Sequence, residues 1–275
     1  MAGSPRRVGL VPAKRRALIL EHLRASGPAS IQELAEVIGG SLSTARRDLE
    51  HLTEAGYLER THGGALLIPP ARAAFEGEFS LQQAMCRAQK QAIGIEAAER
   101  LSSRQSVILD SSSTVLEAVR GVARRSLPLT VVTNSLEIAL VAVGVPDWRV
   151  IVPGGTARPG STMLAGTTGE EFFANIHADV FLVGALAVTG TLLTDATLEV
   201  AALKRAMMRS AHRRILLVDS SKFRPPCFSA FGDLSEIDEV ITDSGIAPEH
   251  LDALAAEDVK VTVVPVPGAE EPPSS

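Results

Sequence analysis

Between residues 107 and 264 the chain alternates short apolar runs rich in β-branched residues with stretches of helical periodicity. Parallel strands need crossover connections, which are usually helices, so this alternation favours an α/β fold built on a parallel sheet. The runs are apolar throughout, which indicates strands that are covered by helices on both faces. The predicted strands are residues 107–109, 129–132, 149–152, 180–183, 215–218, 240–242 and 259–264, and the predicted helices between them are residues 114–122, 136–141, 198–211 and 248–255.

Small polar residues follow four of these predicted strands, at the points where the strands end. In such sheets ligands bind outside the carboxyl ends of the strands, and backbone NH groups at a helix N-terminus attract anions. Each loop alone is compatible with ordinary helix capping, but four loops at one sheet edge indicate a ligand site. The candidate ligand-binding residues are Asp110, Ser111, Ser112, Ser113, Thr114, Thr133, Asn134, Gly154, Gly155 and Lys222.

Lysine is the rarer cation in this sequence, with five lysines among 27 basic residues. A position that stays lysine in such a chain can need a compact ammonium group in place of a guanidinium group. Lys222 directly follows a predicted strand, so it is the strongest candidate for a phosphate contact. We interpret Lys90 and Lys204, which lie beside or within the same region, as charges on helix surfaces.

A second constraint lies near the N-terminus, where residues 41–52 have the pattern of a helix with one apolar flank. Ser41 is placed to cap this helix. The apolar flank consists of Leu42, Ala45, Leu49 and Leu52, and the opposite side carries Ser43, Thr44 and Arg47. Short polar side chains and guanidinium groups near a helix N-terminus suit entry into the major groove of DNA. The alternative is a solvated helix face on which Arg46 and Arg47 pair with Glu50.

The segments around this helix complete a winged helix-turn-helix pattern. A capping box at Ser30 and Glu33 begins a second helix, and Gly39-Gly40 makes a tight turn into the third. The other predicted helices are residues 14–26 and 31–38, and the predicted strands of the wing are residues 57–60 and 65–68. The candidate DNA-binding residues are Lys14, Arg15, Ser41, Ser43, Thr44, Arg46, Arg47, His62 and Gly63.

The two patterns predict two domains in a chain of 275 residues, of which 45% are hydrophobic. This length and composition allow a sizeable core beside a small second one. Paired prolines at residues 69 and 70 favour an extended linker. We expect a disordered arm over residues 1–12, a winged helix-turn-helix domain over 13–68, a linker over 69–84, an α/β domain over 85–266 and a polar tail over 267–275.

Charge and cysteine content indicate which partners and which cellular compartment to expect. The net charge of −5 argues against a uniformly basic nucleic-acid-binding surface, but positive charge is concentrated within residues 1–24. Cys86 and Cys227 are too few for a disulfide framework or a zinc site, which favours a reducing compartment. The sequence has no apolar run long enough to cross a bilayer and no signal-peptide pattern. We therefore expect a cytoplasmic protein with no membrane partner, no metal and no cofactor.

The N-terminal motifs resemble those of a known family. The pattern Ser-x-x-Thr-Ala-Arg-Arg-Asp-Leu over residues 41–49, Gly56-Tyr57-Leu58, and Arg60-Thr61-His62-Gly63-Gly64-Ala65 are similar to the N-terminal signature of the DeoR family of bacterial transcriptional regulators. The spacing between these blocks also agrees with that family. The resemblance implies a wing whose turn approaches a backbone phosphate of DNA.

The loops after the predicted strands resemble the C-terminal sensor domain of the same family, and Ile241-Thr242-Asp243 matches a later signature. This resemblance implies a Rossmann-like α/β domain related to ribose-5-phosphate isomerase, with a phosphorylated sugar or a related metabolite as effector. The first loop departs from the family, which usually has a glycine where this chain has Ser112. If that position requires a positive φ, serine there is strained or the pocket differs.

Three functions compete on this basis. The leading hypothesis is a DNA-binding regulator, a repressor of a carbohydrate operon, whose affinity for a double-stranded operator changes when a sugar phosphate binds. The alternative is an enzyme of sugar-phosphate isomerase type, with acid, base and ammonium groups from Asp195, Glu199, Lys204 and Lys222, but an enzyme does not need a winged helix. A protein-binding adaptor is the third, and it would not need the basic cluster at residues 14–16. Since one winged helix makes few base contacts, we expect a homo-oligomer paired through the larger domain.

Overall fold

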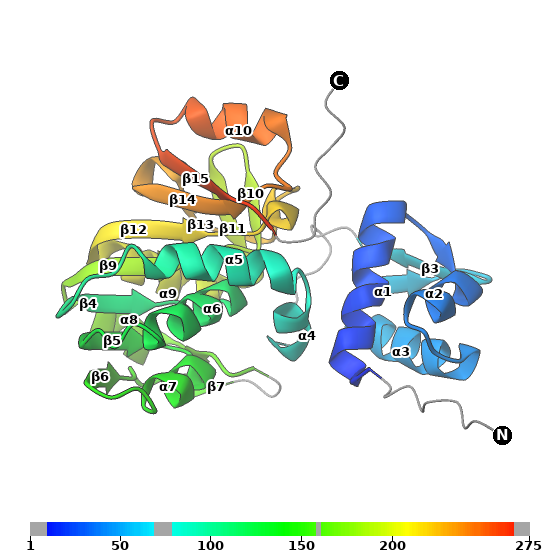
Figure 1. The fold of residues 1–275 in the computed structure, drawn as a ribbon, viewed down its shortest axis with the longest axis horizontal. Helices are drawn as coiled ribbons and strands as arrows, with labels where there is room; N and C mark the ends of the chain where they lie inside the picture. Colours follow the sequence, from blue (N-terminus) through cyan, green and yellow to red (C-terminus); the bar gives the residue numbers. More distant parts are fainter. Residues whose placement is uncertain (1–9, 69–78, 158–160, 267–275) are drawn as a thin grey trace. The chain divides into compact units, whose positions relative to one another are not determined.

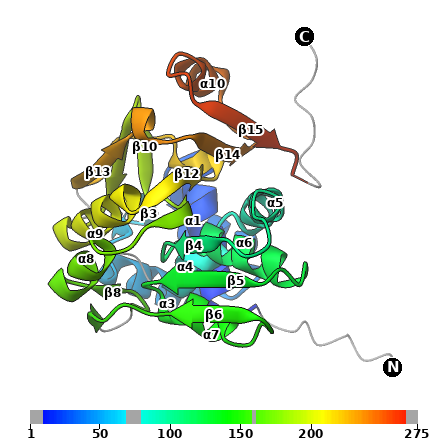
Figure 2. The same cartoon turned by 90° about the vertical axis from the view of Figure 1, so that its left-hand side faces the viewer.

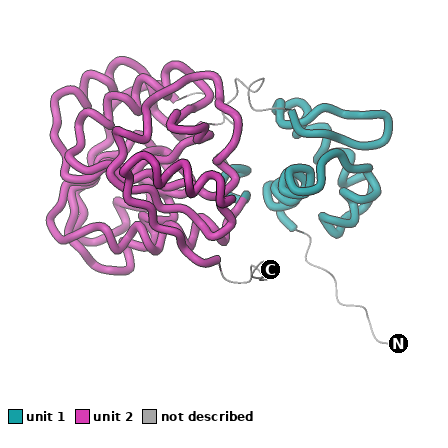
Figure 3. The backbone as a smooth tube through the Cα atoms, turned by 90° about the horizontal axis from the view of Figure 1, so that it is seen from above, with its two compact units in different colours: residues 1–85 teal, residues 86–275 magenta. Residues whose placement is uncertain are grey.

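The computed structural model describes residues 10–68, 79–157 and 161–266. The chain forms two compact units, residues 1–85 and residues 86–275 (Figure 3). The expected N-terminal arm lies largely outside the described residues, and the expected tail lies wholly outside them. No helix in the described ranges is long and apolar enough to cross a membrane.

In the described residues the first unit has four helices and a small antiparallel sheet (Figure 1). Its elements are α1 Pro12–Ser26, β1 Ala29–Ser30, α2 Ile31–Val37, α3 Leu42–Glu54, β2 Leu58–Arg60, β3 Gly64–Leu67 and α4 Phe79–Ala84. The sheet order is β1-β3-β2, in which β2 and β3 form the predicted wing. Ser30 and Glu33 make the predicted capping box at the start of α2. Gly39 adopts a φ of 59°, a left-handed conformation that favours glycine, in the turn between α2 and α3.

Helix α4 lies inside the segment that was expected to be a linker. Leu81 of α4 and Met85 after it are buried in the core of the first unit together with Ile19, Leu20 and Leu23 of α1. The sequence did not predict this helix, because a single short turn of helix carries too little periodicity to be recognised. The rest of the expected linker, residues 69–78, lies outside the described residues.

The second unit is built on a seven-stranded sheet of the order β15-β14-β12-β9-β4-β5-β6. Every neighbouring pair in it is parallel, which confirms the predicted parallel α/β fold. All seven predicted strands are present. They are β4 Ser106–Leu109, β5 Leu129–Thr133, β6 Trp148–Ile151, β9 Ala178–Val183, β12 Ala211–Leu217, β14 Glu239–Asp243 and β15 Lys260–Val264.

Helices cover both faces of this sheet, with α5 and α6 on one side and α8 and α9 on the other (Figure 2). The helices are α5 Arg87–Ala98, α6 Ser113–Ala123, α7 Leu136–Ala142, α8 Thr167–Phe173, α9 Leu198–Arg209 and α10 Pro248–Ala255. Helices α5 and α6 cross closely at Gly94, where an added Cβ would lie 2.6 Å from the Glu117 carbonyl carbon. Lys90 of α5 is buried, so its interpretation as a helix-surface charge is wrong. The reason is that α5 packs on the sheet and on α6 together, and Lys90 lies on the covered side of the helix.

A second, antiparallel sheet stands beside the main one and was not predicted from the sequence. Its strands are β10 Ala187–Thr189, β11 Leu192–Asp195 and β13 Ser229–Asp233, in the order β10-β11-β13. A short hairpin of β7 Thr156–Ala157 and β8 Leu164–Ala165 follows the end of β6. Helix α9 packs against β11 and β13, so this small sheet places further residues near the carboxyl ends of the main strands.

Candidate nucleic-acid interface and ligand site

Helix α3 presents the polar face that the sequence predicted. The Ser41 side chain accepts a hydrogen bond from the Thr44 backbone NH at 3.2 Å, and its hydroxyl also lies 2.8 Å from that of Ser43. Ser43, Arg46 and Arg47 are exposed. The buried flank consists of Ala45, Asp48, Leu49 and Leu52. Leu42 was expected in that flank but is 43% exposed, because it begins the helix and lies beyond the core.

Asp48 fixes α3 to α1 and was missed in the sequence. Its buried carboxylate accepts from Arg15 Nε at 2.7 Å and from Arg16 Nε at 3.2 Å. Arg15 Nη1 also donates to the Leu10 carbonyl oxygen at 2.7 Å. The Arg15 guanidinium therefore has partners within its own unit, and its predicted contact with DNA stays a prediction. Lys14, the other predicted phosphate contact of α1, is exposed.

The wing turn and the α3 arginines lie open on the surface of the first unit. His62 and Gly63 are exposed between β2 and β3, and the Gly63 carbonyl oxygen accepts from the Ile31 backbone NH at 2.9 Å. This bond joins the wing turn to the start of α2. In the described ranges the ion pair of Glu50 is formed with Arg60, at 3.5 Å, and not with Arg46 or Arg47.

The predicted ligand-site loops meet along the carboxyl edge of the main sheet. Leu109 of β4 is in register with Thr133 of β5 and with Leu182 of β9. The residues that follow, Asp110 and Asn134, are therefore neighbours at the end of the sheet. The loop with Gly154 and Gly155 lies one strand further along, after β6, and the loop with Lys222 lies on the other side, after β12. The structure brings the first two loops together and places the others at either flank.

Ser112 does not strain the first loop. Its φ is −81° and its ψ is 140°, which is extended backbone, and its side chain caps α6 by accepting from the Thr114 NH at 3.2 Å. The space for this serine is provided by Gly184, since a Cβ on Gly184 would lie 2.6 Å from the Ser112 Cβ. A positive φ is therefore not needed at this position.

Lys204 is buried at the same edge, so its interpretation as a surface charge is wrong. Its ammonium donates to Asp110 Oδ2 at 3.0 Å, to Asp195 Oδ2 at 2.7 Å and to the Gly184 carbonyl oxygen at 2.7 Å. Burial lowers the pKa of Lys204, but the carboxylates of Asp110 and Asp195 outweigh this and raise the pKa above its ordinary value. We call Asp110, Asp195 and Lys204 the buried triad. Its members come from separate segments, so sequence spacing gave no sign of it.

Two acceptor oxygens at this edge lack donors. In the described part of the chain, the buried Oδ1 atoms of Asp110 and Asn134 have no hydrogen-bond partner. Asn134 donates through Nδ2 to the Leu164 carbonyl oxygen at 3.2 Å, which fixes the side chain. Buried polar atoms are rarely left unpaired in folded proteins. The edge can therefore accept hydrogen bonds from a bound molecule.

The remaining predicted ligand residues have local structural roles. Thr133 is buried and its hydroxyl donates to the Leu109 carbonyl oxygen at 2.8 Å, which joins β5 to β4. Gly155 has a φ of 154°, and a Cβ there would lie 2.9 Å from the Ala165 carbonyl oxygen, so this glycine permits the β7–β8 hairpin. Lys222 is half-buried in a short 3-10 helix, Ser220–Lys222, that Asp219 caps. Ser111 is half-buried, whereas Ser113 and Thr114 are buried at the start of α6.

The two units together define a winged helix-turn-helix protein with an α/β sensor unit. The first unit matches the DeoR-like helix-turn-helix domain over residues 15–70, and the second matches the DeoR C terminal sensor domain over residues 85–244. The chain therefore belongs to the DeoR family, and it is a DNA-binding transcriptional regulator.

Similar proteins cover nearly the same length. The chain is 33% identical over 259 residues to the HTH-type transcriptional regulator GlpR of Haloferax volcanii, covering 93% of this chain and 98% of that protein. It is 30% identical over 234 residues to the transcriptional repressor AccR of Agrobacterium fabrum, covering 84% of this chain and 89% of that protein. Among solved structures, ribose 5-phosphate isomerase A from Methanocaldococcus jannaschii matches 49% of this chain and 53% of that chain, with 17% identity and a TM-score of 0.37.

Proposed function

We propose that this regulator represses a carbohydrate operon, and that a phosphorylated sugar or related metabolite bound at the carboxyl edge of the main sheet changes its operator affinity. The proposal that a ligand binds at this edge rests on the two unpartnered, buried acceptor oxygens of Asp110 and Asn134. A buried acceptor without a donor destabilises a fold by about 1–3 kcal/mol. Sugar hydroxyl groups are donors of the kind that this edge lacks.

The orientation of the ligand follows from the donors of Lys204. An ammonium group has three N–H donors, and all three are directed at Asp110, Asp195 and the Gly184 carbonyl oxygen. None is left for a phosphate, and the two carboxylates give the buried triad a formal charge of −1. The phosphate should therefore lie toward the N-terminus of α6 and toward Lys222, with the hydroxyl groups at Asp110 and Asn134.

Binding to DNA is assigned to the exposed face of α3 and to the wing. Ser43, Thr44 and Arg47 would enter the major groove, where guanidinium groups and hydroxyls read base edges. Arg46, Lys14 and the wing turn at His62 and Gly63 would contact the phosphate backbone. The support for this assignment is that the α3 residues lie in the first turns of a capped helix, outside its buried flank. The residues assigned to the phosphate backbone are all exposed.

We propose binding without turnover of the ligand. A general base must release and accept a proton near neutral pH, and the raised pKa of Lys204 keeps its ammonium protonated there. Of the two carboxylates considered for an isomerase, Asp195 is held by the Lys204 ammonium at 2.7 Å and by the Ala196 backbone NH at 2.8 Å. The other, Glu199, is exposed at the start of α9. The names of the relatives, a transcriptional regulator and a transcriptional repressor, agree with this reading.

Calorimetry with a panel of sugar phosphates and the matching free sugars, joined to gel shifts on the DNA upstream of the operon, tests the proposal. We expect Asn134→Ala to weaken ligand binding about tenfold, the effect of one lost hydrogen bond, and Asn175→Ala, on an exposed site after α8, to leave it unchanged. Lys222→Ala should weaken the sugar phosphates more than the free sugars. Operator affinity without ligand should stay the same in all three variants.

Three results would contradict this proposal. The first is that no sugar phosphate binds, and the second is that one binds without changing operator affinity, because a ligand shifts DNA binding only through differential affinity for two states. The third is catalytic conversion of the ligand by the parent protein, which would favour the isomerase alternative.

A further inference from the structure

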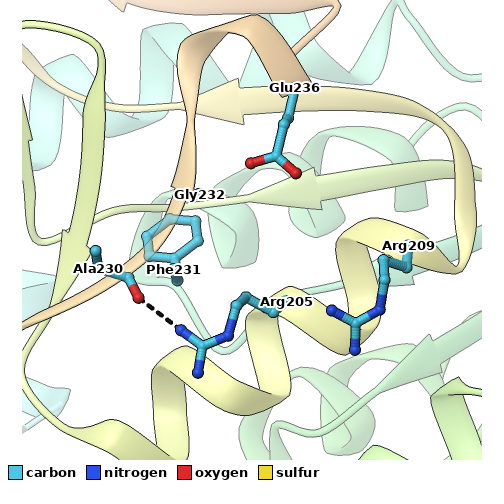
Figure 4. A pocket seen from close by; sticks show the side chains of 6 residues that line it. All are labelled: Arg205, Arg209, Ala230, Phe231, Gly232 and Glu236. Carbon is cyan, nitrogen blue, oxygen red and sulfur yellow. Dashed lines mark hydrogen bonds between the residues drawn. The ribbon is translucent and has the colours of Figure 1, made fainter.

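The outer side of α9 carries a pocket that the proposed effector site does not use (Figure 4). Its volume is about 350 Å³, and it lies between α9 and β13. The lining residues are Arg205, Arg209, Ala230, Phe231, Gly232 and Glu236. Arg205 and Arg209 are four residues apart on one helix, so both guanidinium groups lie on the same face of α9.

The pocket is shaped by the backbone of β13. Arg205 Nη1 donates to the Ala230 carbonyl oxygen at 2.6 Å, which fixes one guanidinium group against the strand. Gly232 leaves the space open, since a Cβ there would lie 3.0 Å from the Met208 methyl carbon and 3.2 Å from Glu236 Oε2. Phe231 lines the pocket from the core side, since its side chain is buried and its ring lies 4.9 Å from the Lys204 ammonium.

The charges in the pocket are not balanced. Among the described residues Arg209 has no ion-pair partner, and Arg205 donates to a neutral carbonyl oxygen. Glu236 lies across the pocket, but its Oε2 accepts from the Asp233 backbone NH at 3.0 Å in a capping box. Two guanidinium groups therefore face one carboxylate that is already engaged, and the net charge of the lining is positive.

We propose that this pocket is a second small-molecule site, which binds an anion that carries a phosphate or carboxylate group. Guanidinium groups bind such oxyanions through paired, charge-assisted hydrogen bonds, and Arg205 keeps further N–H donors beside the one given to Ala230. The volume lies at the lower end of the range for ligand pockets, which restricts the ligand to a small metabolite. None of the residues proposed for the effector site lines this pocket.

Methionine methyl groups allow each site to be observed separately. Met208 is buried, and its methyl group packs against Gly232, which lines the pocket. Met163 pairs with Ser135 at the carboxyl edge of β5. Labelling the methionine methyl groups with carbon-13 and titrating with inorganic pyrophosphate, at constant ionic strength, reports both sites in one NMR spectrum. Substitution of Met208 with Leu assigns its signal.

We expect pyrophosphate to shift the Met208 signal in a saturable manner. Arg209→Ala should weaken this binding about tenfold, because one charge-assisted contact is lost. Arg124→Ala is the matched control, since Arg124 is exposed after the end of α6 and its removal changes the net charge equally. The control should bind pyrophosphate like the parent. Arg209→Lys should bind it more weakly than the parent and more tightly than Arg209→Ala.

The proposal is overturned if the Met208 signal does not move, or if it moves alike in the parent and in Arg209→Ala. A shift confined to Met163 would also overturn it, because that result places the anion at the carboxyl edge alone. Arg209 is an exposed side chain at the end of α9, so its replacement leaves the core of the unit in place.

Discussion

At the scale of single residues, removal of the Lys204 ammonium should lower the free energy of unfolding. Lys204→Met would leave Asp110 and Asp195 buried without their ammonium partner, and breaking a buried ion pair costs about 3–5 kcal/mol. We expect the free energy of unfolding, measured by urea denaturation, to fall by about this amount. Arg209→Met on the same helix removes an exposed charge and should change it by less than about 0.5 kcal/mol. Equal midpoints for the two variants would contradict the buried triad.

Glu239 should make the stability of the second unit depend on pH in the acidic range. Its carboxylate is fully buried and accepts from Arg100 Nε at 2.9 Å, with Arg213 Nη2 at 2.6 Å and Lys260 Nζ at 3.0 Å. Burial raises the pKa of Glu239, but the hydrogen bonds from Arg100, Lys260 and Thr262 outweigh it and hold the pKa below its ordinary value of 4.5.

A carboxyl group with a lowered pKa in the folded state stabilises the fold above its unfolded pKa, and that stabilisation is lost as the pH falls through the folded pKa. We therefore expect the free energy of unfolding to decline below about pH 4.5, with a shallower decline in Glu239→Gln. Denaturation curves of both proteins between pH 7 and pH 3.5 measure this difference. Parallel pH profiles would show that Glu239 does not contribute.

Residue-level prediction succeeded where a local rule decided the outcome. Ser30 and Ser41 cap their helices as expected, because capping depends on neighbouring backbone NH groups. The burial of Lys90 and Lys204 could not be predicted, because their surroundings come from distant segments. The same holds for Ser112, whose fit depends on the absence of a side chain at Gly184.

At the scale of elements, α3 supplies a direct test of the DNA interface. Arg47→Ala should cost about 1–3 kcal/mol of specific operator binding if Arg47 reads a base, because that contact discriminates between sequences. Lys14→Ala should weaken binding to all DNA sequences alike. It should also reduce the slope of log affinity against log salt concentration by about one unit, the contribution of one phosphate contact. Arg24→Ala, exposed at the end of α1, is the control. Gel shifts with operator and unrelated DNA at several salt concentrations separate these effects.

If Arg47→Ala bound the operator as tightly as the parent, α3 would not be the helix that recognises the operator bases. Arg15 is unsuited to this test, although it was predicted to contact phosphate, because its guanidinium binds Asp48 of α3. Replacing Arg15 would change the attachment of α3 to α1 as well as any contact with DNA.

Element prediction was complete for the main sheet and incomplete beside it. The seven strands were predictable because strands buried on both faces are continuous apolar runs. Strands β10, β11 and β13 were not predicted, since they are short and mix polar with apolar residues, and their pairing is long-range. This small sheet carries Asp195, so the missing element is also the reason that the buried triad was missed.

At the scale of the whole molecule, we propose that two or more copies associate through the second unit. Helix α7 lies beside β6, the edge strand of the main sheet, and presents exposed apolar side chains at helical spacing. These are Leu136, Leu140 and Val143, and Leu140 is 75% exposed. An apolar stripe of this kind on a protein surface is typical of an interface. A second copy is the partner we propose, because pairing two winged helices raises their effective concentration at a repeated operator.

Leu140→Glu places a charge in the middle of this stripe and should dissociate the oligomer, because a charge buried in an apolar interface loses its hydration. Ile95→Glu, at an exposed apolar position on α5, is the matched control and should assemble like the parent. Gel filtration with light scattering measures the mass against the 29.0 kDa of one chain. A parent mass of one chain, with and without DNA, would contradict the oligomer, whereas an oligomeric Leu140→Glu would place the interface elsewhere on the unit.

If Leu140→Glu dissociates, its operator binding should weaken while its ligand binding stays unchanged, because only the pairing of the winged helices is lost.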